Sequence, residues 1–358
     1  MALLLGGAVT EKNLKIDDIM IGSKKSKNGG LLELIAWGRA ELSRAGIDEA
    51  QEECERVLMK LFVCSRSGIY LEEHELTASG VRERFLTLIE KRVRRVPLAY
   101  LLKEADFWQE TLYVDERCLI PRPETEILIE QVLKTLGKDD EKNFSFLDVG
   151  TGSGAIAIAI LRAFRNARGT LLDISGEALE VARVNVEKYK LQDRATFIRG
   201  DLFGSFSNNE KWDLIVSNPP YLSEEDWKGV QEELKFEPRG ALDGGKDGLD
   251  FYRRIIEGAQ SHLTSGGLLA LEVGGQAGPP IPTGTTQSAV VRHAVKSRTL
   301  SSAERARFNK NRALRGLDAP SSQAETVSKW LHDAGYDNIQ RFNDHLQVQR
   351  IVTARRHS

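Results

Sequence analysis

Residues 143–160 constrain the fold of this 358-residue chain more than any other segment. An apolar stretch reaches Asp148, then come Gly150, Gly152 and Gly154, and a run of alanine and isoleucine follows. Glycine permits a sharp turn and a close approach of the backbone to a ligand, and the start of a helix presents free N–H groups. The segment therefore predicts a strand, a glycine-rich ligand-binding turn and an apolar helix.

The spacing of these glycines favours a cationic cofactor over a dinucleotide. A pyrophosphate site needs the spacing G-x-G-x-x-G, whereas here the third glycine follows after one residue. The carboxylate of Asp148 would also repel phosphate. S-adenosylmethionine, which carries an ammonium and a sulfonium group, suits this turn better, with NAD or a plain tight turn as the alternatives.

Two further candidate strands end in carboxylates. Asp173 lies about 23 positions after Gly150, near the separation at which an acid binds ribose hydroxyls. Asp201 follows a strand that begins near residue 195, where it can accept a hydrogen bond from an adenine amino group or instead cap the next turn. Because open α/β sheets bind ligands at the carboxyl ends of their strands, these acids and the glycine turn predict one shared site.

A fourth motif, Asn218-Pro219-Pro220-Tyr221, follows the apolar run 212–217 and predicts chemistry on a planar nitrogen. The lone pair of an amide or aromatic amino group is delocalised, so the group must be oriented before it reacts. The Asn218 side-chain carbonyl and the Pro219 backbone carbonyl can each accept one hydrogen of an NH2 group, and Tyr221 can stack on it. We predict that the four residues are catalytic; a plain Asn-Pro turn is the alternative.

With these motifs the chain resembles the HemK/PrmC family, protein-(glutamine-N5) methyltransferases that use S-adenosylmethionine and modify the Gly-Gly-Gln glutamine of peptide-chain release factors. The resemblance covers about residues 31–272 and resumes near residue 323. It is carried by residues 107–108 (FW), 119–126 (LIPRPETE), 148–154, 218–221 and 236–249 (FEPRGALDGGKDGL). The Asn-Pro-Pro-Tyr motif is shared with adenine-N6 and ribosomal-RNA methyltransferases, whereas IPRPETE and EPR are far more specific to glutamine methylation.

The resemblance implies an α/β fold, a seven-stranded Rossmann-like class I methyltransferase domain preceded by a small helical-bundle domain. Asn218 and Pro219 would hold the glutamine amide, and Phe107 and Tyr221 would flank it. Arg122 and Glu124 would shape the same cleft; a proline-stiffened entry into a helix is the plainer interpretation of their segment. The implied cofactor-binding residues are Asp148, Gly150, Thr151, Gly152, Gly154, Asp173, Asp201, Leu202 and Asn218.

We expect four parts along the chain. Residues 1–29 would form a flexible leader and 30–102 a helical domain that docks the substrate. Residues 103–125 would form a hairpin linker and 126–358 the methyltransferase domain. Apolar residues at helical spacing over 31–101 predict three or four packed helices.

Residues 277–323 depart from the family pattern. Gln276-Ala277 is repeated at Gln323-Ala324, so removing the residues between the two copies restores a continuous family sequence. The basic residues in this tract favour binding to RNA or the ribosome. Its composition and length instead favour a disordered loop or an error in the predicted gene.

The overall composition favours a protein substrate. The formal net charge is −2 and the pI about 6.4, without the basic field typical of nucleic-acid binding, except in the inserted tract. The three cysteines lack CxxC spacing and the histidines are scattered, so we expect neither disulfides nor a metal site. No apolar run approaches the roughly 18 residues of a membrane span. We expect a cytoplasmic protein, or a mitochondrial one if its source is eukaryotic.

The sequence thus predicts methyl transfer from S-adenosylmethionine to the N5 nitrogen of the release-factor glutamine, in support of translation termination. An adenine-N6 DNA or ribosomal-RNA methyltransferase is one alternative. A noncatalytic protein that binds the cofactor or a release factor, disabled by the insertion, is another.

Overall fold

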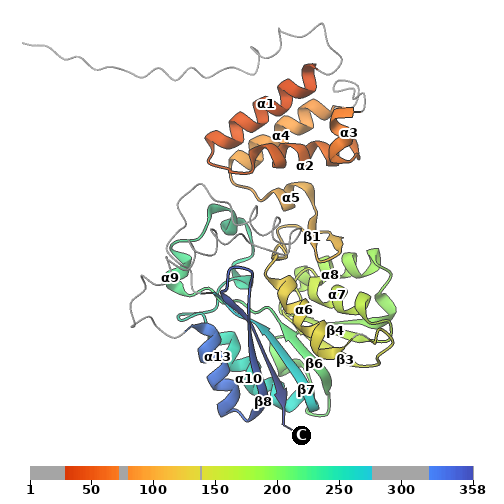
Figure 1. Cartoon of the computed structure of the whole chain (residues 1–358), viewed down its shortest axis with the longest axis vertical. Coiled ribbons are helices and arrows are strands. Elements are labelled where there is room, and N and C mark those ends of the chain that lie inside the picture. The colour runs from red at the N-terminus through yellow and green to blue at the C-terminus, as the bar shows by residue number, and fades with distance from the viewer. Residues whose placement is uncertain (1–28, 72–79, 138, 276–321, 358) are drawn as a thin grey trace, which may run out of the picture. The chain divides into compact units, whose positions relative to one another are not determined.

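The computed structural model describes residues 29–71, 80–137, 139–275 and 322–357, which form two units that divide between Arg94 and Arg95 (Figure 1). The expected leader, apart from Gly29, lies outside the described residues. So does the expected insertion, apart from Ser322 and Gln323. Within the described residues, no helix combines the length and the apolar character needed to cross a membrane.

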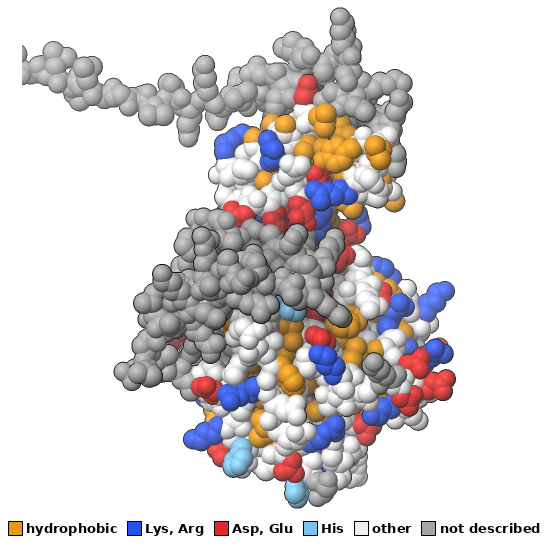
Figure 2. Space-filling view, viewed as in Figure 1, with side chains coloured by type: hydrophobic (Ala, Val, Ile, Leu, Met, Phe, Trp, Pro, Cys, Tyr) orange, Lys and Arg blue, Asp and Glu red, His pale blue; other side chains and the backbone are white. Residues whose placement is uncertain are grey.

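The first unit is a bundle of four helices, as the apolar spacing predicts. They are α1 (Gly29–Arg44), α2 (Ala50–Phe62), α3 (Arg66–Leu71) and α4 (Val81–Val93). Gly38 allows α1 to pack closely, because a Cβ there would lie 2.8 Å from Cys54 Sγ and 2.9 Å from Phe85 Cζ. Exposed apolar side chains, including those of Tyr70 and Leu71, gather near α3 on the surface of this unit (Figure 2).

The second unit is built on a seven-stranded sheet. Its strands are β3 (Ser145–Val149), β4 (Arg168–Asp173), β5 (Ala195–Arg199), β6 (Trp212–Ser217), β7 (Leu263–Glu272), β8 (Tyr336–Asn343) and β9 (Gln349–Arg356). Their order is β5-β4-β3-β6-β7-β9-β8; the first five are parallel, and β9 runs antiparallel to both neighbours. This topology confirms the predicted Rossmann-like fold with an antiparallel final strand.

Helices cover both faces of the sheet (Figure 1). One face packs against α6 (Thr125–Leu136), α7 (Ala155–Ala163) and α8 (Gly176–Lys188), and the other against α10 (Asp250–His262) and α13 (Gln323–Asp333). Consecutive strand residues alternate between the two cores: Phe146 belongs to the first and Leu147 to the second. The apolar runs of the strands are thus explained by burial on both sides.

Short elements complete the second unit. They are α5 (Leu98–Leu102), the antiparallel hairpin of β1 (Ala105–Phe107) and β2 (Glu110–Leu112), α9 (Glu224–Trp227), and 3₁₀ turns at Gln192–Arg194, Leu202–Ser205, Glu232–Phe236 and Arg239–Ala241. The hairpin lies within the expected linker, and α5 groups with the second unit although the sequence places it among the first helices.

The pairing register aligns the carboxyl ends of the central strands. Val149 of β3 pairs with Leu172 of β4 and with Ser217 of β6, and Ser217 pairs with Leu271 of β7. The residues that end or follow these strands therefore meet at one edge of the sheet, where open α/β sheets bind their ligands.

Candidate active site

The turn between β3 and α7 leaves open space above its glycines. Gly150 and Gly152 have φ values of 72° and 55°, and a Cβ on either would find no atom within 4 Å. Gly154, with φ of 82°, differs, because a Cβ there would lie 3.3 Å from the Cβ of Ala182 on α8. Gly150 and Gly152 thus border room for a ligand, while Gly154 allows α7 and α8 to pack together.

Asp148 lies fully buried beneath this turn. One carboxylate oxygen, Oδ2, accepts a hydrogen bond of 2.7 Å from the Thr151 hydroxyl. The other, Oδ1, has no hydrogen-bond partner among the described residues. Burial raises the pKa of Asp148 to about 7. A buried oxygen without a partner suits a cationic or hydrogen-bond-donating group, and it stands beside the open turn.

Asp173 ends β4 next to the same turn. Its two oxygens accept one backbone N–H each, from Gly152 and from Ser175, both at 2.9 Å. These two bonds fix the carboxylate and leave lone pairs for further donors such as a pair of hydroxyls. Burial raises its pKa. Ile174, the next residue, is 66% exposed at this edge. Sequence reasoning did not single it out, although an apolar residue directly after a strand-ending acid was a visible signal of an exposed position there.

Asp201 follows β5, an edge strand of the sheet, by two residues. Its Oδ2 forms a 2.7 Å ion pair with Arg254 of α10, and both side chains are about half exposed. Asp201 precedes a 3₁₀ turn without a capping hydrogen bond from its side chain, so the capping alternative is absent. Leu202 adopts a φ of 50° and its side chain packs into the core on the α10 side.

Asn218 follows β6, whose last residue, Ser217, donates a 2.7 Å hydrogen bond to the carbonyl of Val149. The Asn218 amide nitrogen Nδ2 donates to the hydroxyl of Thr125 at 3.1 Å. The amide nitrogen is therefore engaged by α6, and the carbonyl oxygen is the end available to accept hydrogen bonds from another group.

The glycine-rich residues 242–248 pack against the Asn-Pro-Pro-Tyr motif. Leu222 exchanges backbone hydrogen bonds with this segment: its N–H donates to the carbonyl of Leu242 at 2.9 Å, and its carbonyl accepts from the N–H of Gly244 at 2.8 Å. A Cβ on Gly244 would lie 2.8 Å from the Cα of Tyr221, so only glycine fits. Burial raises the pKa of Tyr221 to about 12, which keeps its phenol neutral. The segment thus fixes the backbone at Tyr221.

The charged residues of the IPRPETE segment have different interaction partners. Arg122 pairs with the buried Glu237, which also accepts the backbone N–H of Ile120 at 3.0 Å. Glu124 lies immediately before α6 and makes no capping hydrogen bond. Glu126 accepts the backbone N–H of Trp108 at 2.8 Å. Arg122 therefore joins this segment to the EPR segment, which sequence reasoning did not foresee.

Phe107 is placed in the apolar core. It is 2% exposed and belongs to the cluster that α6 and α7 form with the sheet. The resemblance implies that Phe107 flanks the substrate amide, and this stays a prediction. The structure surrounds the ring with apolar side chains.

Glu272 is a further carboxylate at this edge that sequence reasoning passed over. It ends β7 and is 1% exposed. Its Oε2 has no hydrogen-bond partner within the described residues, and burial raises its pKa to about 7. The signal was present in the sequence, since Glu272 ends an apolar strand as Asp173 does.

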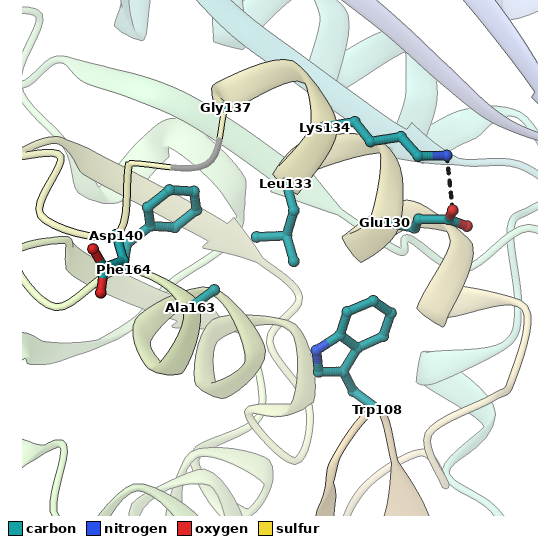
Figure 3. A pocket seen from close by; sticks show the side chains of 8 residues that line it. All are labelled: Trp108, Glu130, Leu133, Lys134, Gly137, Asp140, Ala163 and Phe164. Carbon is teal, nitrogen blue, oxygen red and sulfur yellow. Dashed lines mark ion pairs between the residues drawn. The ribbon is translucent and has the colours of Figure 1, made fainter.

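A separate hollow of about 380 Å³ lies against α6 and α7 (Figure 3). Trp108, Leu133 and Phe164 give it an apolar lining, and Lys134 pairs with Glu130 at 2.7 Å at its rim. None of the motif acids or Asn218 lines it. The strand edge, with its buried unpartnered oxygens, is therefore the candidate active site.

Comparisons with known proteins match both units. Residues 33–102 match the PrmC N-terminal domain and residues 124–245 the methyltransferase small domain. The release factor glutamine methyltransferase of Bacillus anthracis is 38% identical over 246 residues, which cover 68% of this chain and 85% of that protein. Proteins of the same name from Rhodopirellula baltica (34% over 246 residues, 68% and 83% covered) and Chlorobaculum tepidum (36% over 256 residues, 70% and 87% covered) are similar to this chain over comparable lengths.

Proposed function

The chain belongs to the family of release factor glutamine methyltransferases, and we propose that it methylates the side-chain amide nitrogen of the glutamine in the Gly-Gly-Gln motif of peptide-chain release factors. The enzyme is a methyltransferase that depends on S-adenosylmethionine. The observation that carries the proposal is the hydrogen bond from the Asn218 amide nitrogen to Thr125, because it leaves the Asn218 carbonyl oxygen to receive the substrate amide.

The buried acids and the glycine turn suit the cofactor. S-adenosylmethionine supplies an electrophilic methyl group on a sulfonium. The unpartnered oxygen of Asp148 and the open space at Gly150 and Gly152 fit a cationic ligand with no phosphate. Asp173, held by two backbone N–H groups, would bind the ribose hydroxyls. Thr151, Gly154, Asp201, Leu202 and Asn218 complete the proposed cofactor-binding set, in which Gly154 acts through the packing of α7.

Asn218 and Pro219 would orient the substrate nitrogen. Each of their carbonyl oxygens accepts one hydrogen of the glutamine NH2 group, which directs the nitrogen lone pair along the line of transfer. As the N–C bond forms and the S–C bond breaks, positive charge develops on the nitrogen, and the same two oxygens stabilise it. Water can take the surplus proton afterwards. Pro220 stiffens the motif, and Tyr221 covers the planar amide and excludes water.

Arg122 and Glu124 would contribute to the cleft indirectly. Arg122 pairs with Glu237 and so joins two segments that border Asn218 and Tyr221. Glu124 lies next to Thr125, the residue that binds the Asn218 amide. We propose that both shape the cleft through these neighbours.

Contacts of Gln323 favour an intact enzyme over one disabled by the insertion. Its side-chain Oε1 accepts from the backbone N–H of Gly274, and its Nε2 donates to the carbonyl of Tyr221, both at 2.9 Å. Ser322 and Glu325 form a capping box at the start of α13. The residues on both sides of the tract are thus tied to the motif that carries the proposed chemistry. The cytosol, where release factors act, is the compartment we propose.

Methyl transfer to alternative acceptors tests the proposal. The full chain is incubated with S-adenosylmethionine labelled in its methyl group and with a Gly-Gly-Gln peptide, adenine-containing DNA or ribosomal RNA. We expect label in the peptide alone, and none in a Gly-Gly-Glu peptide that lacks the amide nitrogen. Label in a nucleic acid and not in the peptide would replace this proposal with the adenine-N6 alternative.

A further inference from the structure

The side chain of Gln323 connects three segments of the second unit. Its Nε2 donates to the carbonyl of Tyr221 at 2.9 Å and to the carbonyl of Gly248 at 3.3 Å, and its Oε1 accepts the N–H of Gly274 at 2.9 Å. Tyr221 belongs to the Asn-Pro-Pro-Tyr motif, Gly248 ends the glycine-rich residues 242–248, and Gly274 follows the end of β7 by two residues. One side-chain amide therefore binds three backbone segments that are distant in the chain.

The three partners fix the orientation of this amide. Each partner is a backbone group with a fixed role, because an N–H only donates and a carbonyl only accepts. Oε1 must therefore face Gly274, and Nε2, which carries two hydrogens, must face the carbonyls of Tyr221 and Gly248. A turned amide would lose all three hydrogen bonds.

Glycines at two of these contacts let the amide and Tyr221 approach the backbone closely. A Cβ on Gly248, where φ is 72°, would lie 2.4 Å from the Tyr221 carbonyl oxygen and 2.7 Å from Gln323 Nε2. A Cβ on Gly274 would lie 2.6 Å from Gln323 Oε1 and 2.8 Å from Cδ2 of the Tyr221 ring. The Tyr221 ring thus lies against the same backbone group that Gln323 binds.

The helix α13 gives Gln323 a firm base. Ser322 and Glu325 form a capping box at the start of this helix. Ala324 and Val327 are fully buried in the core that α13 shares with α10. Because the backbone of Gln323 is fixed and its amide has three partners, the carbonyl of Tyr221 is held in place relative to the sheet.

We propose that Gln323 is a positioning residue whose side-chain amide fixes the Tyr221 backbone against Gly274 and so holds the Tyr221 ring in place over the substrate amide. This inference rests on the proposed function and deepens it. It assigns Gln323 no contact with the substrate or the cofactor. Its effect is on turnover, because the ring covers the reacting amide and keeps it in line with the methyl group.

Two substitutions of similar length at position 323 test this role. Gln323→Met removes every hydrogen bond of the amide, whereas Gln323→Glu keeps an acceptor for Gly274 and has no hydrogen for the two carbonyls at neutral pH. We expect both to lower kcat on a Gly-Gly-Gln peptide about tenfold, with the Kd of S-adenosylmethionine changed less than about twofold. A parental kcat for Gln323→Glu would overturn the proposal, because the hydrogen bond to Tyr221 would then be dispensable.

Two control variants separate this role from general damage to the fold. Gln276→Met makes the same substitution in the other copy of the Gln-Ala repeat. Ser322→Ala removes the capping box of α13 and leaves the Gln323 amide in place. We expect both to keep the parental kcat, although Ser322→Ala should lower the melting temperature. A loss of kcat in either control as large as that in Gln323→Met would overturn the proposal.

A double-mutant cycle tests whether Gln323 acts through the Tyr221 ring. Tyr221→Ala removes the ring and keeps the backbone carbonyl that Gln323 binds. In this background Gln323→Met should cost little further kcat, because the ring that it positions is gone. Independent, multiplicative losses of kcat would show that Gln323 acts on turnover by another route and would overturn the proposal.

The proposed function can fail separately from this inference. If the parent chain binds S-adenosylmethionine but does not methylate the peptide, the proposed substrate is wrong. If the parent methylates the peptide and the variants Gln323→Met and Gln323→Glu match it, only the positioning role is wrong.

Discussion

Arg122 and Glu237, which lie 115 residues apart in the sequence, form an ion pair that joins the IPRPETE segment to the EPR segment. The Glu237 side chain is 1% exposed and the Arg122 side chain 29% exposed. Glu237 also receives the backbone N–H of Ile120 at 3.0 Å. A single buried carboxylate therefore holds the approach to α6 against the segment that precedes the glycine-rich residues 242–248.

Removing Arg122 should destabilise the second unit. Arg122→Ala leaves the Glu237 carboxylate buried without its cation, and we expect a loss of roughly 2–3 kcal/mol in the free energy of unfolding. Chemical denaturation of the full chain measures it. Arg239→Ala is the control, because the pair of Arg239 with Asp243 is exposed and should contribute about 0–1 kcal/mol. Equal effects of the two changes would contradict a bracing role for Arg122.

Asp148→Asn should stabilise the protein without cofactor and weaken cofactor binding. Asparagine keeps an acceptor for Thr151 and removes a buried charge whose Oδ1 is unpartnered within the described residues. At pH 8 we expect the free energy of unfolding to rise by about 1–3 kcal/mol. The affinity for S-adenosylmethionine, measured by calorimetry, should fall. A variant that is less stable and binds the cofactor normally would contradict the assignment of Asp148.

The pH dependence of stability follows from the same carboxyl. Burial raises the pKa of Asp148 from 3.8 to about 7 in the folded protein. The protonated form is thus favoured by folding, and its contribution to stability is full below pH 3.8 and is lost as the pH rises to about 7. The stability of Asp148→Asn relative to the parent should rise across this window. Glu272 titrates in both proteins, so the difference between them isolates Asp148.

Deleting residues 277–323 should preserve the fold and the activity. Gly274 and Gln323 are joined by a 2.9 Å hydrogen bond, so the chain segments on either side of the tract lie next to each other. The deletion joins Gln276 to Ala324 and gives Gln276 the place of Gln323. We expect a melting temperature and a kcat on the Gly-Gly-Gln peptide close to those of the parent. Loss of folding or of activity would show that the tract is needed.

The sequence predicted the features that depend on local patterns. The apolar runs, the glycine turn and the acids at strand ends predicted that Asp148, Asp173 and Asn218 lie at one edge of a sheet, and the family resemblance implied the α/β fold. Each of these signals can be read from a short segment. The alternation of side chains along a strand and the φ angle of a glycine both depend on neighbouring residues alone.

Contacts between segments distant in the chain could not be predicted from the sequence. Thr125 meets Asn218 only once α6 has packed against the sheet, and nothing local in residues 123–126 indicates it. The burial of Phe107 in the core likewise depends on the packing of α6 and α7, and its predicted place beside the substrate stays a prediction. Gly244 likewise depends on the close approach of Tyr221.

The central claim is that Asn218 orients a glutamine amide for methylation. We would incubate the full chain with S-adenosylmethionine and a release factor, and locate the added methyl group by fragmentation mass spectrometry. The account predicts one methyl group on the Gly-Gly-Gln glutamine. Asn218→Ala should lower this transfer about 100-fold or more with cofactor binding retained, and Asn343→Ala, an exposed change on β8, should leave it unaltered. Unmodified glutamine with the folded, cofactor-binding parent, or full transfer by Asn218→Ala, would contradict it.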